Sequence, residues 1–383
     1  MIAFAASRLY TPLDTVDEPL VLVEDGRILE VTSRAAKQLP ANARLVEFTD
    51  AILAPGFFDI HIHGAAGHDV MGDDPAGLSA VELLIAQHGV TGYFPTTVTA
   101  PLDQTMAALE RLAAAIEKGE AGAAGGRARP LGIHLEGPFI SHAKRGVHPS
   151  GHLLPPSEAV FERFWQASRG HIKVMTIAPE LEGAQAVIAE AARRGVCASL
   201  GHSDADMQST RAGVAAGARH ATHAFNAMRG FDHRDPGIVG EMLNDSRISA
   251  DIIADGIHVD PVVVELFLKM KGVEGAVLIT DATAATGMPD GRYRLGSFEV
   301  EVQDGKCMAE GKLAGSVLTM DRALRNTMQF ANWELQKALR LATLNPARVA
   351  GLTGRGELRA GYAADMVALT AAGEVKATIV GGV

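Results

Sequence analysis

The sequence ILAPGFFDIHIHG, residues 52–64, is a short apolar run with two histidines near its end. Seven similar runs follow it, and Ala-rich stretches with helical periodicity lie between them. The apolar runs are residues 52–64, 89–98, 128–137, 172–179, 196–203, 219–228, 247–259 and 275–283; the helical stretches are residues 75–89, 101–120, 157–170, 182–195, 205–217 and 260–272. Strands that alternate with helices predict βαβ units and a parallel sheet.

Eight such strands over about 290 residues match a closed (β/α)₈ barrel. An open, doubly wound sheet is the alternative. It would carry a G-x-G-x-x-G or Walker sequence after its first strand, and neither follows residue 56. We therefore predict an α/β fold with a TIM-like (β/α)₈ barrel over residues 54–345.

Both ends of the chain consist of short β-rich runs. VLVEDGRILEV, residues 21–31, places two such runs around Asp25-Gly26, a hairpin turn sequence, and residues 365–383 alternate β-branched residues around a glycine turn. Neither end is long enough to bury a core alone. We predict that residues 1–53 and 346–383 together form a small β-sandwich domain.

Composition excludes several classes of protein. The chain has 383 residues, 47% of them apolar, and 35 Lys+Arg against 45 Asp+Glu give a net charge of −10. These values are globular, and the acidic balance argues against a nucleic-acid partner. Two cysteines, Cys197 and Cys307, are too few for a disulfide framework or a cysteine-built zinc site. Without a long apolar run or a cationic leader, we expect a cytoplasmic protein with no membrane partner.

Histidines and carboxylates gather at the ends of the predicted strands. These residues are Asp59, His61 and His63 on the first strand, His134 and Glu136 on the third, His202 on the fifth, His223 on the sixth, His258 on the seventh and Asp281 on the eighth. In a barrel these ends converge on one face, where active sites lie. Imidazoles and carboxylates without thiolates suggest a divalent ion, with Zn²⁺ first and Fe²⁺ or Mn²⁺ as alternatives.

Each of these residues also has a structural interpretation. His61 and His63 point to the same side of a strand and could be core histidines with hydrogen-bonded neighbours. Glu136 could cap a helix or form a salt bridge, and His202 or His223 alone could bond a backbone carbonyl. Their convergence favours metal binding, whereas we expect the neighbouring His134 to be a core or supporting residue.

Asp281 follows the eighth strand in the sequence LITDAT. An aspartate beside an activated water can accept its proton and later return it to a leaving group. A turn aspartate with local backbone bonds is the alternative. Its position on the last barrel strand favours catalysis.

The order of these motifs resembles the amidohydrolase superfamily and, within it, the family of N-acetylglucosamine-6-phosphate deacetylases. The resemblance covers nearly the whole chain. Its motifs are APGFFDIHIHG, LEGPFI, KRGVHP, GHSDA, THAFNAM, DPG, IADGIHV, LITDAT, LAGS, NPA and AADMV. It implies a metal-dependent hydrolase barrel beside a small β domain formed by both termini, in agreement with the fold predicted above.

The resemblance implies a metal site for one or two divalent ions. Glu136, His202 and His223 resemble the core ligands, and His61 and His63 resemble the ligands of an additional position, with Asp281 as a further ligand. Many superfamily relatives bridge two ions with a carboxylated lysine on the fourth strand. Here that strand has only Lys173 at its start, so Glu136 would be the bridge.

It also implies the remaining roles. Asp281 resembles the general base and acid, and His148 a residue that polarises the substrate carbonyl. The residues that resemble substrate contacts are Asn226 and Ala227 through their backbone, His258, and the loop of Leu313, Ala314 and Gly315. Arg234 resembles an arginine that reaches phosphate across a homodimer interface, with Arg229 as the alternative.

The implied reaction is hydrolysis of the N-acetyl group of N-acetylglucosamine 6-phosphate. Alternatives are the galactosamine epimer, another amidohydrolase substrate such as a cyclic amide or an acylated amino acid, and a non-catalytic metal-binding regulator. A net charge of −10 repels a dianionic amino-sugar phosphate. Local cations must therefore hold the phosphate.

Overall fold

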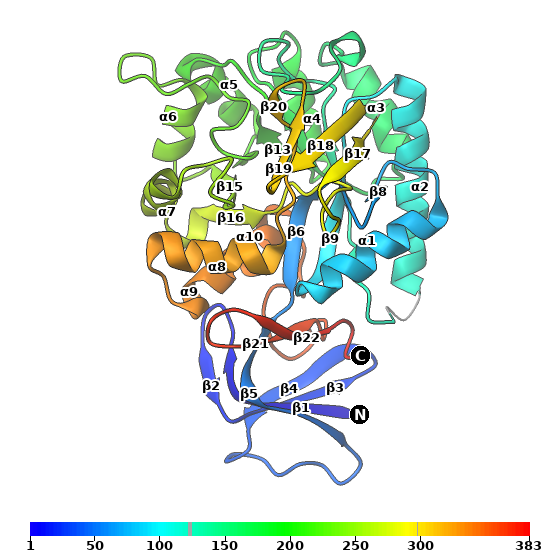
Figure 1. Ribbon diagram of the computed structural model, residues 1–383, viewed down its shortest axis with the longest axis vertical. Helices are drawn as coiled ribbons and strands as arrows, with labels where there is room; N and C mark the ends of the chain where they lie inside the picture. Colours follow the sequence, from blue (N-terminus) through cyan, green and yellow to red (C-terminus); the bar gives the residue numbers. More distant parts are fainter. Residues whose placement is uncertain (122–124, 297) are drawn as a thin grey trace.

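The computed structural model describes residues 1–121, 125–296 and 298–383. A ring of helices surrounds a parallel barrel, and a small sheet lies against one end (Figure 1). The barrel strands are β6 (Phe57–Ile62), β9 (Val90–Thr97), β11 (Ile133–Glu136), β12 (Ile172–Ile177), β13 (Cys197–Leu200), β14 (His220–Ala221), β15 (Ser249–Ile253) and β16 (Ala276–Ile279). They pair in this order, β10 (Arg129–Pro130) adds to β9, and a bridge between Ile62 and Ala282 joins the last strand to the first. The predicted barrel is confirmed.

Six helices lie where the sequence predicts them, apart from small differences at their ends. They are α1 (Pro75–Gln87), α2 (Leu102–Ala121), α3 (Glu158–Ala167), α4 (Ala184–Arg193), α5 (Met207–Ala216) and α7 (Pro261–Gly275). The side chains of Asp74, Ser157, Asp206 and Asp260 accept backbone N–H groups at the starts of α1, α3, α5 and α7. Such caps satisfy N–H groups that have no partner inside the helix, which explains where these helices begin.

Further elements were not predicted. They are α6 (Gly237–Asn244), α8 (Met320–Ala331), α9 (Leu335–Ala342), α10 (Leu344–Val349), the short 3₁₀ helix η1 (Ser150–His152) and the two-residue strands β7 (Gly64–Ala65) and β8 (His68–Asp69). In the part of the chain that the structure describes, no helix combines the length and hydropathy needed to span a membrane.

A four-stranded antiparallel sheet between β16 and α8 was also missed. It consists of β17 (Gly291–Leu295), β18 (Phe298–Gln303), β19 (Lys306–Ala309) and β20 (Lys312–Leu313). These strands are short and alternate exposed with buried residues, so they lack the continuous apolar runs of the barrel strands. The sheet lies beside the carboxyl ends of the barrel strands (Figure 1).

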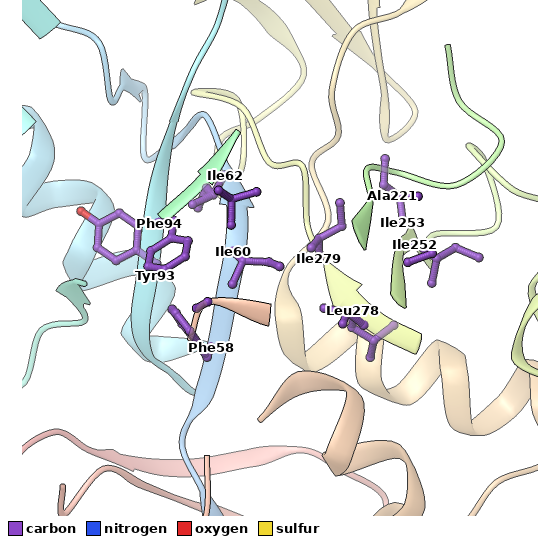
Figure 2. Close-up of a cluster of buried hydrophobic side chains, with 14 of the residues drawn as sticks. Phe58, Ile60, Ile62, Tyr93, Phe94, Ala221, Ile252, Ile253, Leu278 and Ile279 are labelled. Carbon is purple, nitrogen blue, oxygen red and sulfur yellow. The ribbon is translucent and has the colours of Figure 1, made fainter. Parts of the chain in front are cut away.

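The apolar side chains of the barrel strands form its main core (Figure 2). On β6, Phe58, Ile60 and Ile62 alternate with Asp59 and His61, because successive strand residues point to opposite faces. Phe58 packs edge-on against Phe94 of β9, with ring centroids 5.0 Å apart. The apolar face anchors the strand and thereby directs its polar residues into the barrel.

The small domain is a sheet of seven strands from both ends of the chain. Its strands are β1 (Ile2–Tyr10), β2 (Thr15–Asp17), β3 (Pro19–Glu24), β4 (Arg27–Ser33), β5 (Arg44–Pro55), β21 (Met366–Leu369) and β22 (Val375–Ile379). Phe4 and Val21 share one core with Met366 and Ala368. The predicted β domain from both termini is confirmed, and only Gly56 separates β5 from barrel strand β6.

Candidate active site

A cavity of about 340 Å³ lies at the carboxyl ends of the barrel strands. Its lining includes His63, Glu136, His148, His202, His223, Asn226, Ala227, His258, Asp281, Leu313, Ala314 and Gly315. All of them come from the predicted set of site residues. His61 is fully buried and its Nε2 lies 3.4 Å from Glu136 Oε1, so the structure brings together every predicted site residue except Arg234.

The carboxylate of Glu136 lies at the centre of the cluster. The distances from its Oε1 are 3.1 Å to His223 Nε2, 3.3 Å to His202 Nε2 and 3.4 Å to His61 Nε2, and those from its Oε2 are 3.2 Å to His63 Nε2 and 3.5 Å to His148 Nε2. Each oxygen thus faces a different group of imidazoles. Both oxygens lie within 3.5 Å of imidazole nitrogens, so this carboxylate can share a divalent cation with histidines on either side of it.

Backbone carbonyls set the orientation of two of these rings. The Nδ1–H of His63 donates to the Thr96 carbonyl at 3.0 Å, and the Nδ1–H of His202 donates to the Lys144 carbonyl at 2.9 Å. In each neutral ring the Nε2 lone pair therefore points into the cluster, as metal-ligating histidines require.

The spacing of the donor atoms fits a metal ion. His202 Nε2 lies 3.0 Å from His223 Nε2, and His61 Nε2 lies 3.3 Å from His63 Nε2. Two tetrahedral ligands at about 2.1 Å from zinc lie roughly 3.4 Å from each other. A divalent cation would satisfy lone pairs that otherwise face one another, so the residues present fit the group that the sequence predicts.

His148 differs from the other imidazoles. Its Nδ1 accepts the backbone N–H of Thr99 at 3.2 Å, so in the neutral ring the proton is on Nε2. Although His148 groups with Glu136 and His202 by distance alone, a protonated Nε2 offers no lone pair to a metal. It is a hydrogen-bond donor that points toward the cavity, which suits the predicted contact with a carbonyl oxygen.

Asp281 lies two residues after the end of β16 and faces the same cluster. Its Oδ1 lies 3.2 Å from His63 Nε2 and 3.5 Å from His61 Nε2, while its backbone N–H donates to the His61 carbonyl at 2.9 Å. A Cβ on Gly315 would lie 2.9 Å from the Asp281 carbonyl. Glycine at this position lets the loop after β20 approach the aspartate closely.

Three functional side chains leave their strands through left-handed backbone. The φ angles are +45° at His202, +32° at His223 and +49° at Asp281. Non-glycine residues with positive φ are uncommon and are concentrated at functional sites. The conformation turns each side chain out of the regular strand direction and toward the cluster.

The buried carboxylates favour positive charge in the cluster. Burial lowers the pKa of His223, but the hydrogen bond and negative charge of Glu136 outweigh burial and raise it to about 9. For Asp281, burial raises the pKa, but the charge of His61 and the hydrogen bond with His63 outweigh it and lower the pKa to about 2. Asp281 is therefore ionised at neutral pH and able to accept a proton.

The predicted substrate contacts differ in their availability. His258 donates from Nδ1 to Asp255 at 2.7 Å, which leaves Nε2 for a ligand. The backbone N–H of Asn226 already donates to the His223 carbonyl at 2.9 Å. Of the two predicted backbone contacts, the one at Ala227 is therefore better placed to bind an anion.

The two candidate arginines have different surroundings. Arg229 is half-buried, forms an ion pair with Asp235 and donates to the Asp204 carbonyl at 3.2 Å. Arg234 is exposed on the loop before α6, outside the cavity lining. Neither arginine is part of the cavity lining.

Three other residues from the sequence analysis lie outside the cavity lining. His134 is a fully buried residue that donates to the Ile60 carbonyl at 3.0 Å and accepts from Thr176 at 2.8 Å, as expected of a core histidine. Asp59 accepts the Thr280 hydroxyl at 2.5 Å and the His61 N–H at 3.2 Å. Lys173 lies at the start of β12, at the end opposite the cavity.

Two cationic cavity residues were missed. Lys144 and Lys312 both line the cavity. Lys144 is the first residue of the motif KRGVHP, and Lys312 directly precedes the motif LAGS, so a search for cations in and beside these motifs would have found both.

The chain resembles known proteins over nearly its full length. The model of the Amidohydrolase family matches residues 52–383. The N-acetylglucosamine-6-phosphate deacetylase of Lysinibacillus sphaericus is 37% identical, with 91% of this chain and 88% of the relative covered. The N-acetylgalactosamine-6-phosphate deacetylase of Escherichia coli O157:H7 is 38% identical, with 95% and 94% covered.

A solved structure matches the whole fold. It is an N-acetyl-D-glucosamine-6-phosphate deacetylase variant from Mycobacterium smegmatis in complex with N-acetyl-D-glucosamine-6-phosphate, with a TM-score of 0.91 and 34% identity over 100% of this chain and 98% of that chain. Sequence and fold therefore agree on the assignment. The chain belongs to the amidohydrolase family.

Proposed function

We propose that the protein hydrolyses the N-acetyl group of N-acetyl-D-glucosamine 6-phosphate to D-glucosamine 6-phosphate and acetate. The observation that carries the proposal is the shared cavity of Asp281, His148 and the Glu136 cluster. It combines a proton acceptor, a hydrogen-bond donor and a metal site around one space. The relatives with 33–38% identity that bear this activity in their names support it.

Amidohydrolases are metal-dependent, and the described residues form two candidate ligand groups. His61, His63 and Asp281 would hold one divalent ion. Glu136 and His202 would hold the other with His223, whose Nε2 lies 3.1 Å from Glu136 Oε1 and 3.0 Å from His202 Nε2, rather than with His148. Nitrogen and carboxylate ligands at tetrahedral spacing favour Zn²⁺, with Fe²⁺ and Mn²⁺ as alternatives. When bound, such an ion polarises a carbonyl and lowers the pKa of water.

The chain's own groups move the protons. Asp281 accepts a proton as the water oxygen bonds to the amide carbon, and His148 stabilises the negative charge that develops on the carbonyl oxygen with a hydrogen bond from its Nε2–H, which keeps its proton. Asp281 then returns the proton to the amine nitrogen while the C–N bond breaks. The products are acetate and the free amino sugar.

The phosphate needs positive or N–H-bearing groups. His258 and the Ala227 backbone lie in the cavity, and Lys144 and Lys312 add positive charge to its lining. Because Arg234 is exposed and lies outside the lining, we propose that it binds the phosphate in the active site of a partner subunit of a homodimer. A guanidinium suits this role because it binds two phosphate oxygens at once.

The galactosamine epimer is a second candidate substrate, because a relative named for that activity is 38% identical over 95% of this chain. We expect purified protein with added Zn²⁺ to release acetate faster from N-acetylglucosamine 6-phosphate than from its galactosamine epimer or the unphosphorylated sugar. An enzymatic acetate assay measures all three. Faster turnover of the epimer would reassign the substrate, and no turnover of either phosphate would reject the proposed function.

Asp281→Asn should retain the fold but lower kcat about 10²–10⁴-fold, the usual contribution of general acid–base catalysis. Asparagine has nearly the same shape but does not accept and return the proton. Asp304→Asn is a matched control, because Asp304 also has left-handed backbone (φ +51°) but is exposed in the turn between β18 and β19. Metal content is measured alongside kcat. Undiminished turnover in metal-replete Asp281→Asn would show that another group is the base.

At metal saturation, we expect two ions roughly 3.5–4 Å apart, as in other two-metal sites. The two donor groups around Glu136 provide the reason. Anomalous diffraction from zinc-saturated crystals locates the ions. One ion at Glu136, His202 and His223, with His61 and His63 unliganded at saturation, would contradict the two-metal proposal.

Arg234→Ala should raise KM for the phosphorylated substrate by about tenfold or more, since a charged hydrogen bond contributes about 1.5–3 kcal/mol. The unphosphorylated sugar should be little affected. Arg322→Ala, at an exposed position on α8, controls for the loss of one surface charge.

Mixing Asp281→Asn chains with Arg234→Ala chains tests the contribution in trans. Exchange should restore activity, because one site of each mixed dimer receives an intact base and an intact arginine. Demonstrated subunit exchange without recovered activity would reject the contribution in trans.

A further inference from the structure

The barrel strand that leads to His223 is short, and its ladder with β13 contains two residue pairs, Ser199–His220 and Leu200–Ala221. β14 consists of His220 and Ala221 alone. Its ladder with β15 contains only the pairs His220–Ser249 and Ala221–Ala250. His223 follows two residues later with φ +32°. The regular ladder therefore ends before it reaches His223.

Asp251 of β15 holds the chain where the ladder ends. Its carboxylate Oδ1 accepts the backbone N–H of His223, and its backbone carbonyl accepts the N–H of Ala224 at 2.8 Å. Both contacts fall on residues in the turn. Side-chain and backbone oxygens of one residue thus replace the missing sheet hydrogen bonds.

His220 holds the other side of this carboxylate. Its Nε2–H donates to Asp251 Oδ2 at 2.9 Å, and its Nδ1 lies 2.7 Å from the Ser249 hydroxyl. Both His220 and Asp251 are 0% exposed, so neither reaches the substrate. A buried carboxylate is stable only when it is hydrogen-bonded, and here imidazole and backbone N–H groups share that task.

We propose that His220 and Asp251 are positioning residues that hold the backbone of His223 in its left-handed conformation and so set the affinity of the metal site. The inference rests on the proposed function, in which His223 is a metal ligand. Without the Asp251 carboxylate, the His223 N–H loses its acceptor and the uncommon φ angle loses its support. The conformation in which the His223 imidazole faces Glu136 is then less populated.

The experiment compares zinc affinities, measured by competition with a chromophoric chelator, and the absorption spectra of the Co²⁺-substituted proteins. Asp251→Ala should lower zinc affinity about 10–100-fold, the usual effect of removing a group that orients a ligand, and should change the Co²⁺ spectrum. Asp251→Asn should restore most of the affinity. Its amide oxygen can accept the His223 N–H, and its NH₂ group can donate to His220 after the ring proton moves to Nδ1.

Ile252→Ala is the matched control. Ile252 is the next residue on β15, fully buried, and points to the opposite face of the strand. It should lower the melting temperature of the metal-free protein but leave zinc affinity and the Co²⁺ spectrum unchanged. An equal loss of affinity in Ile252→Ala and Asp251→Ala would mean that general destabilisation is the cause and would overturn the proposal.

A double-mutant cycle isolates the route of the effect. In a His223→Ala background, Asp251→Ala should not lower zinc affinity further, because the ligand it positions is gone. A full additional loss in that background, or wild-type affinity in Asp251→Ala alone, would overturn the proposal. If His223 is not a metal ligand, the result is different, because His223→Ala would then bind zinc like the wild type.

His220→Ala gives a second route if Asp251→Ala does not fold. It removes one hydrogen bond from the carboxylate but leaves the acceptor of the His223 N–H in place. We expect a smaller loss of zinc affinity in the same direction, again accompanied by a changed Co²⁺ spectrum. Wild-type zinc affinity and a wild-type Co²⁺ spectrum in His220→Ala would overturn the proposal that His220 helps to position His223.

Discussion

The contact between the Glu136 carboxylate and the imidazoles around it is the interaction on which the site depends. A carboxylate buried among ring nitrogens is costly unless positive charge compensates it. The surrounding histidines come from β6 and from the segments after β11, β13 and β14, so the charge is compensated only when the barrel is closed. Because metal binding requires the same geometry, folding and metal affinity are coupled.

Much of the fold follows from the order of apolar runs in the sequence. Each predicted barrel strand contains an observed strand, because buried parallel strands require continuous apolar residues. The convergence of Glu136, His202 and His223 also follows from the sequence, since a barrel brings all strand ends to one face whatever the details of each strand. The boundaries at residues 53–54 and 345–346 remain predictions.

Other features depend on contacts that are distant in sequence or leave no periodic pattern. The protonated nitrogen of His148 is decided by the backbone N–H of Thr99, 49 residues away. The hydrogen bond between His220 and Asp251 joins residues 31 positions apart, and no sequence motif indicates it. The sheet of β17–β20 escaped prediction because its strands are half exposed, and their buried residues pack with Val147 and Ala285, which are distant from most of the sheet in sequence.

The position of β5 has a consequence for synthesis on the ribosome. β5 pairs with β1 on one side and with β21 on the other, and it leads through Gly56 directly into the strand of His61 and His63. A nascent chain therefore carries His61 and His63 long before residues 366–369 exist to complete the sheet beside them. Until residues 136–223 follow, these two histidines lack the carboxylate and imidazoles that surround them in the folded barrel.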